Sequence, residues 1–263
     1  MKGNDMEFAL VNGERDIPQL GVVAECPGCG APVTAKCGEQ RVWHWAHKGR
    51  KHCDPWHENE TEWHRGWKSL FPQECQEVIH VAPDGEKHIA DVKTPHGLVI
   101  EFQHSHLQPD ERRAREAFYD RMIWVVDGSR LKRDRPRLVE SFRFWHRVGN
   151  SLLFLTPFVG KTLPKNWTGC KVPVMFDFTA GDNFVARTTP GGTNLWCLFP
   201  GRVAGYAMIA LCGRNALLRD ALSGKLNLNH EGLAKGVTTY MARQNAAARM
   251  QTRRWSGRRR ARF

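Results

Sequence analysis

Two acidic residues lie where strands are expected, and together they can hold a divalent cation. Asp91 falls in the strand-like segment 88–94 and Glu101 in the segment 99–105, with Gln103 two residues further on. Asp and Glu are poor strand formers, so carboxylates in both strands of a hairpin need a reason. Side chains two apart share one face of a strand, so Glu101 and Gln103 point the same way, and Asp91 reaches that side if the segments pair. The two carboxylates would then bind Mg²⁺ or Mn²⁺ beside a phosphodiester bond.

A helix is expected immediately before these strands, over residues 58–70. Glu60, His64 and Lys68 are spaced four apart and share one stripe of that helix, opposite a tryptophan stripe. Glu60 can complete the metal shell, while His64 and Lys68 can contact phosphate or water. The alternative interpretation is an ordinary solvated helix face.

Four cysteine and histidine residues have the spacing of a tetrahedral zinc site. Cys26 and Cys29 form one close pair in a Pro-Gly-rich knuckle, and His44 and His47 form a second. Zinc in structural sites takes four such ligands, and a small module can depend on the metal for folding. Cys37 is a possible replacement ligand, and Cys53 with His52 or His57 could donate to a second site.

Positive charge is concentrated at the end of the chain. Of the net charge of +12, residues 235–263 contribute +9, from Lys235 and eight arginines without any acid, which leaves +3 for the other residues. Such a segment suits the phosphate backbone of DNA through counterion release. A solvated, disordered tail is the alternative. The residues predicted to contact DNA are Lys48, Arg50, Arg112, Arg113, Arg253, Arg254, Arg258, Arg259 and Arg260, although helix-surface arginines can also form surface ion pairs.

The pattern of elements predicts a mixed α/β fold. A helix over 58–70 precedes strands at 74–81, 88–94 and 99–105, and a further helix precedes the almost wholly apolar strand 122–127. An apolar strand of this kind suits the interior of a mixed sheet. We predict four regions: a zinc-binding module over 1–53, a core over 54–130, an accessory α/β domain over 131–234, and a basic, disordered tail over 235–263.

Several of these segments together resemble a known family. The segments CPGC, HWAH, ETEWH with Lys68, HIAD, IEFQHS and IWVVD look like the competence protein CoiA-like family, whose nuclease core belongs to the PD-(D/E)xK, or restriction-endonuclease-like, superfamily. The resemblance implies a metal-dependent DNA nuclease with Asp91 and Glu101 as metal ligands, Glu60 on the first core helix and Gln103 at the usual lysine position. Glutamine cannot supply positive charge. Lys68 is the first candidate to replace that charge, and Lys93 is the second.

Composition and segment hydropathy favour a reduced, cytoplasmic protein. The first twenty residues lack the apolar core of a signal peptide, and the most apolar stretch, residues 195–213, is interrupted by Pro200 and Arg202. We therefore expect free cysteines and no membrane partner. The rival interpretations are a non-cleaving DNA-binding protein and a zinc-stabilised scaffold for another protein. A homodimer, and partner proteins of recombination, DNA uptake or defence, are left open by the sequence.

Overall fold

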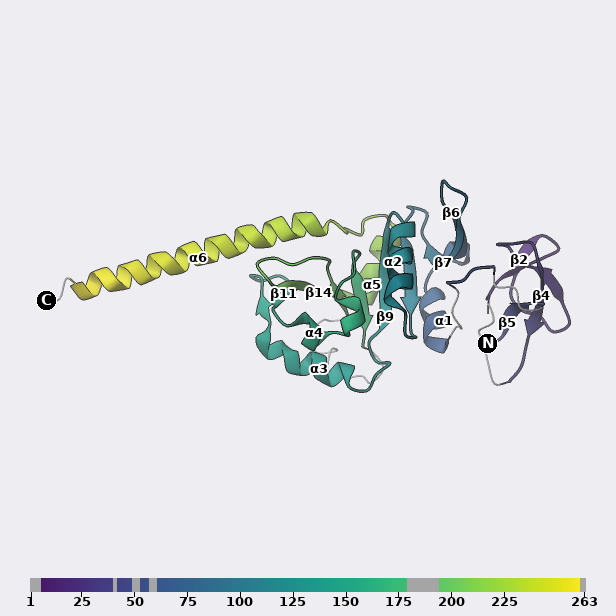
Figure 1. The fold of residues 1–263 in the computed structure, drawn as a ribbon, viewed down its shortest axis with the longest axis horizontal. Coiled ribbons are helices and arrows are strands. Elements are labelled where there is room, and N and C mark those ends of the chain that lie inside the picture. Colours follow the sequence, from purple (N-terminus) through teal and green to yellow (C-terminus); the bar gives the residue numbers. More distant parts are fainter. Residues whose placement is uncertain (1–5, 40–41, 49–52, 57–60, 179–193, 261–263) are drawn as a thin grey trace.

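The computed structural model describes residues 6–39, 42–48, 53–56, 61–178 and 194–260. The strands in this part of the chain form a five-stranded sheet near the N-terminus and a nine-stranded sheet in the body of the molecule. In Figure 1 the small sheet lies at one end of the molecule, and the long helix α6 extends from the other end.

The N-terminal sheet is antiparallel, with the strand order β2-β1-β3-β4-β5. Its strands are β1 (Ala9–Val11), β2 (Glu14–Asp16), β3 (Val23–Glu25), β4 (Pro32–Lys36) and β5 (His44–His47). Asn12 and Gly13 join β1 to β2 with φ values of 53° and 87°, the conformation of a two-residue hairpin turn. The core under this sheet is small and includes Met6, Val33 and Trp45.

The nine-stranded sheet is mixed, as the sequence predicts. Its order is β10-β11-β14-β13-β12-β9-β8-β7-β6, and only the β8–β9 and β9–β12 pairs are parallel. The strands of its first half are β6 (Gln76–Val81), β7 (Lys87–Lys93), β8 (Val99–Gln103) and β9 (Met122–Asp127). The strands of its second half are β10 (His146–Arg147), β11 (Leu153–Thr156), β12 (Val174–Asp177), β13 (Asn194–Leu198) and β14 (Ala207–Gly213). Every residue of β9 is buried, which confirms the interior position predicted from its apolar sequence.

Helices cover both faces of the nine-stranded sheet. One face packs against α2 (Pro109–Phe118), α3 (Asp134–Ser141) and α4 (Val159–Thr162). The opposite face packs against α1 (Glu62–Lys68) and α5 (Arg214–Leu222). Thr61 caps α1, because its side chain accepts a hydrogen bond from the backbone N–H of His64.

The boundary predicted between residues 130 and 131 falls inside this sheet. Strands β6–β9 and strands β10–β14 lie on either side of the boundary in sequence, yet β9 pairs directly with β12. The expected strands in SLLFLTPF and VPVMFDF appear as β11 and β12, and the expected helix in ALLRDAL appears as α5. The two predicted regions therefore share one layer of structure.

The C-terminal segment is helical, whereas the sequence predicted a disordered tail. Helix α6 (His230–Arg260) begins with Leu233, Ala234, Val237 and Met241 packed against the β11–β14 end of the sheet. Residues 242–250 are all exposed, and the helix continues away from the body (Figure 1). Ala, Arg, Gln and Met are strong helix formers and dominate this stretch, which explains the helix despite the charge.

Candidate metal centre and acidic pair

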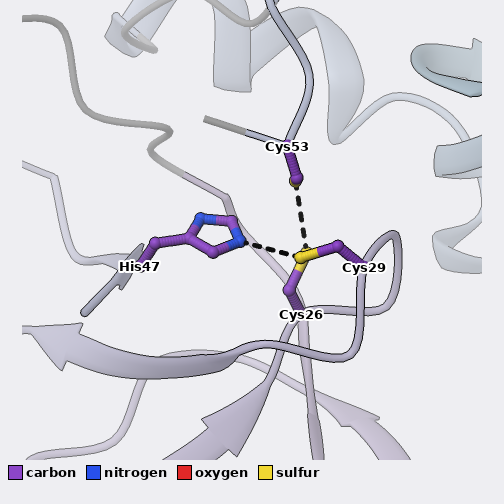
Figure 2. Close-up of side chains that lie close together, drawn as sticks. All are labelled: Cys26, Cys29, His47 and Cys53. Atoms are coloured by element: carbon purple, nitrogen blue, oxygen red, sulfur yellow. Dashed lines mark hydrogen bonds between the residues drawn. The ribbon is translucent and has the colours of Figure 1, made fainter. Parts of the chain in front are cut away.

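Four side chains from the N-terminal module converge on one point. They are Cys26 and Cys29 from the knuckle after β3, His47 from the end of β5, and Cys53 from the chain leading to the main sheet. One ligand atom from each lies within 4.8 Å of the others (Figure 2). The knuckle is closed by hydrogen bonds from Cys26 N to Ala31 O and from Gly30 N to Cys26 O, both 2.8 Å.

These distances fit a tetrahedral zinc site. The sulfurs of Cys26 and Cys53 are 3.6 Å apart, and Cys29 Sγ lies 3.3 Å from His47 Nε2. Ligands at ordinary zinc bond lengths and tetrahedral angles would be about 3.8 Å and about 3.5 Å apart, respectively. Three thiols and one imidazole are also the donor set that zinc prefers. This cluster can therefore hold a structural metal such as zinc.

The Cys26 thiol has a lowered pKa, which favours metal binding. The hydrogen bond with Cys53 lowers the pKa of the Cys26 thiol to about 5, against an opposing effect of burial. The same hydrogen bond, with burial, raises the pKa of Cys53. A thiolate is the form of cysteine that binds metal ions.

His44 is the one predicted zinc ligand that the structure places elsewhere. His44 and His47 both lie in β5, and side chains an odd number of residues apart in a strand point to opposite faces. His44 is buried, and its Nδ1 lies 2.9 Å from Val42 O. Cys53 takes the fourth position, whereas Cys37 is outside the cluster. His52 and His57, considered for a second site, lie outside the described residues.

The residue after Cys53 ties the metal centre to the main sheet. Asp54 is buried and accepts hydrogen bonds from the backbone N–H groups of Trp56, at 2.9 Å, and Ile89, at 2.7 Å. Its other contact is His88 Nδ1, at 2.9 Å. His88 and Ile89 belong to β7, the strand that carries Asp91. The candidate zinc site is thus joined to the strand of the acidic pair through the peptide bond between Cys53 and Asp54 and the hydrogen bonds of the Asp54 side chain.

Asp91 and Glu101 lie next to each other, where β7 and β8 stop pairing. The ladder between the strands contains Val92↔Ile100 and Lys93↔Val99, and beyond it Asp91 Oδ2 accepts the N–H of Phe102 at 2.8 Å. Glu101 Oε1 lies 3.4 Å from Asp91 N. The hairpin arrangement predicted from the sequence therefore brings these two acidic residues together.

Each carboxylate also has a basic partner from a helix. His64 Nε2 of α1 lies 3.0 Å from Asp91 Oδ2. Arg115 of α2 donates to Glu101 Oε2 at 3.0 Å and to Glu111 at 2.5 Å. The sequence gives no sign of the Arg115 contact, because it depends on how α2 packs on the sheet.

The proximity of the two acids separates their pKa values. Burial and the charge of Asp91 raise the pKa of Glu101 to about 8, although Arg115 opposes the shift. The pKa of Asp91 falls to about 2, because His64, Lys68 and the Phe102 N–H outweigh the effect of burial. A cation between two neighbouring carboxyl groups, one of them buried, would offset the repulsion between their charges.

The remaining residues predicted for this site have defined partners. Lys68 is fully buried, with Nζ 2.7 Å from Glu77 Oε1 and 3.2 Å from Glu7 Oε2. Gln103 is buried and its amide donates to Ser105 at 3.3 Å. Lys93 Nζ, the second candidate for the missing charge, lies 3.0 Å from His80 Nδ1. Glu60 lies outside the described residues.

The predicted DNA contacts are only partly on the surface. Arg112 is buried, donates to Glu116 at 2.6 Å and packs against Cys170, so its side chain is largely enclosed. Arg113 is exposed and pairs with Asp110, and Lys48 is exposed. Arg50 lies outside the described residues. The five predicted tail arginines belong to α6.

Comparison with known proteins gives one match. The family described as "Competence protein CoiA, N-terminal domain" matches residues 25–55, a segment that contains all four residues of the cysteine-histidine cluster. This match supports the resemblance to the CoiA-like family over the N-terminal module. No curated protein and no solved structure matches the chain. Among the residues described here, no helix is both long and apolar enough to cross a membrane.

Proposed function

We propose that this protein is a metal-dependent DNA nuclease that cleaves phosphodiester bonds with Mg²⁺ or Mn²⁺ at Asp91 and Glu101. One observation carries the proposal: the buried carboxyl of Glu101 and the half-buried one of Asp91 lie together, and burial with the charge of Asp91 raises the pKa of Glu101 to about 8. Holding two such acids side by side is unfavourable unless a positive charge joins them. A divalent ion with oxygen ligands supplies that charge.

The residues of the site have separate tasks in this proposal. Asp91 and Glu101 hold the ion, with Glu60 as a further candidate ligand. When bound, the ion would activate a water molecule and neutralise charge on the scissile phosphate. His64 fixes the orientation of Asp91 through their 3.0 Å contact, and Lys68 keeps Asp91 ionised. Gln103 would orient the attacking water.

DNA is the proposed substrate for two reasons. The N-terminal match is to a competence protein family, which suggests a role related to DNA uptake, recombination or defence. The net charge of +12 also favours a polyanion. The zinc site would stabilise the N-terminal module rather than react. A cytoplasmic location is proposed with this function, and it suits the eight free cysteines.

The test is cleavage of linear, circular and single-stranded DNA by the zinc-loaded protein, with and without Mg²⁺ or Mn²⁺. Cutting should require the added ion and should fall by at least about a hundredfold in Glu101→Gln and in Asp91→Asn. Glu74→Gln, at an exposed position just before β6, is the matched control and should cut normally. Equal activity of the wild type and Glu101→Gln on every substrate would refute the proposal.

A non-cleaving DNA-binding protein is the second candidate. It is favoured by the ion pair between Glu101 and Arg115, which already neutralises the acid, and by glutamine at position 103. This candidate predicts DNA binding without Mg²⁺ or Mn²⁺ and no cleavage with them. Unchanged DNA affinity in Glu101→Gln, with an inactive wild type, would favour it over the nuclease.

A further inference from the structure

A second surface feature lies away from both candidate metal sites. An open cavity of about 450 Å³ is bounded by the end of α3, the following 3-10 turn (Phe142–Phe144) and the start of α4. Figure 1 places α3 and α4 side by side on the same edge of the molecule. The residues that matter here are Phe144, Phe158, Arg137, Arg143 and Lys161, which we call the α3–α4 groove.

Two exposed aromatic rings stand together in the α3–α4 groove. Phe144 is 39% exposed and Phe158 is 44% exposed, although phenylalanine is usually buried. Their ring centroids are 5.5 Å apart and the planes meet at 84°. Two neighbouring, partly exposed rings offer apolar surface to a ligand.

Cations surround these two rings. The guanidinium of Arg143 lies 4.7 Å from the ring centre of Phe144, and Lys161 Nζ lies 5.4 Å from that of Phe158. Arg137 also lines the groove, where Glu140 is the one acid among the described lining residues. The groove thus combines apolar faces with positive charge.

The charge of residues 130–147, which include α3, favours a polyanion as the ligand of the groove. Residues 130–147 contain seven arginines and lysines against two acids, a net charge of +5. With +9 in residues 235–263, the rest of the chain sums to −2, since the total is +12. The net positive charge of this protein therefore comes from residues 235–263 and from residues 130–147, which include α3.

Helix α3 connects the α3–α4 groove to the neighbourhood of the acidic pair. A second cavity, at the carboxyl ends of β8 and β9, is lined by Arg130 and Asp134 together with His104 and Asp127. His104 follows Gln103, the last residue of the strand that carries Glu101. A strand of nucleic acid at the acidic pair could therefore continue along α3 into the groove.

We propose that the α3–α4 groove binds single-stranded DNA, with bases stacked on Phe144 and Phe158 and phosphates contacted by Arg137, Arg143 and Lys161. Only unpaired bases expose the faces that stack on aromatic side chains. This inference rests on DNA as the ligand in the proposed function and adds the form of that DNA. It does not require cleavage.

The test is the affinity of the full-length, zinc-loaded protein for labelled DNA, without Mg²⁺ or Mn²⁺, by fluorescence anisotropy. The two ligands are an oligothymidylate of about 20 nucleotides and a duplex of the same length. The F144A/F158A double variant should bind the oligothymidylate roughly 30-fold more weakly, if each lost stack contributes about 1 kcal/mol. Its affinity for the duplex should not change, because phosphate contacts from α6 serve both ligands.

Two controls separate stacking from a damaged fold. Phe144→Tyr/Phe158→Tyr keeps both rings and should bind the oligothymidylate like the wild type. Leu70→Ala removes another exposed apolar side chain, at the end of α1, and should have no effect. Unchanged oligothymidylate affinity in the double alanine variant, or an equal loss for both ligands, would overturn the inference. Normal metal-dependent cleavage alongside that result would leave the proposed function standing.

Discussion

In the cysteine-histidine centre, the fourth metal ligand is Cys53 rather than His44. Strand alternation turns His44 away from His47, and Cys53 completes the cluster from outside the sheet. Because Cys53 is also the residue before Asp54, the metal would hold the start of the chain segment that enters the main sheet.

The first prediction distinguishes Cys53 from His44. Cys53→Ser should lose most of the bound zinc and lower the melting temperature, since a hydroxyl is a poor zinc ligand. His44→Gln should retain one zinc per chain. The zinc content of each purified protein, measured by mass spectrometry, checks both outcomes. Full zinc occupancy in Cys53→Ser would contradict the assignment of this centre.

The second prediction concerns the proton on Glu101. Without Mg²⁺ or Mn²⁺, the unfolded carboxyl loses its proton near its ordinary pKa of 4.5, whereas the folded one keeps it until about pH 8. The folded state binds more protons between these values, so the free energy of unfolding should fall as pH rises, by up to about 1.4 kcal/mol per unit.

Urea unfolding of the zinc-loaded protein between pH 5 and about pH 8 measures this slope. Glu101→Gln should flatten it, because glutamine does not titrate, while Glu140→Gln on the surface should keep it. An identical slope in the wild type and Glu101→Gln would show that Glu101 is not protonated in the folded protein.

At the level of elements, buried hydrogen bonds join the N-terminal module to β6 and β7. Asp54 satisfies the N–H of Ile89 and contacts His88, and Glu77 of β6 accepts the N–H groups of Glu7, at 2.9 Å, and Phe8, at 3.1 Å. Both acids are buried, so the two sheets are docked by polar contacts as well as by packing.

The third prediction tests this docking. Asp54→Asn should lower the free energy of unfolding by roughly 1–3 kcal/mol, because an amide replaces one acceptor oxygen with a donor and leaves a buried group unsatisfied. Glu86→Gln alters the exposed partner of His88 and should change stability by less than about 0.5 kcal/mol. Urea unfolding at constant zinc content is the measurement. Equal stability of both variants would contradict the docking role.

Local sequence patterns predicted the elements well and their long-range contacts poorly. Period-two and apolar patterns located β7, β8 and β9, because those signals are local. The contact between Glu101 and Arg115 could not be predicted, since it depends on how α2 packs on the sheet. Strand alternation alone could have excluded His44 as a ligand. Cys53 could not be identified as a ligand from the sequence, because that depends on where the folded chain returns to the other three residues.

On the scale of the whole molecule, the basic helix α6 lies at the opposite end of the sheet from the acidic pair. Helix α6 packs on β11 and β14, whereas Asp91 and Glu101 lie on β7 and β8. Five strand spacings separate β11 from β8, which is about 24 Å. DNA that contacts both places must cross the sheet.

The fourth prediction follows from this separation. A chain ending at Met241 keeps the part of α6 that packs on the sheet and loses eight arginines. It should melt like the full chain and bind duplex DNA more weakly. Its salt dependence should also be smaller, by about 0.9 in the logarithmic slope for each lost phosphate contact. Titrations at several salt concentrations measure this, and an unchanged slope would show that α6 does not contact DNA.

The central claim is that Asp91 and Glu101 together bind a divalent ion, and calorimetric titration of the zinc-loaded protein with Mn²⁺ tests it most directly. We expect heat from one site per chain that disappears in Asp91→Asn and in Glu101→Gln and persists in Glu140→Gln. No heat in the wild type, or the same heat in all four proteins, would contradict the account.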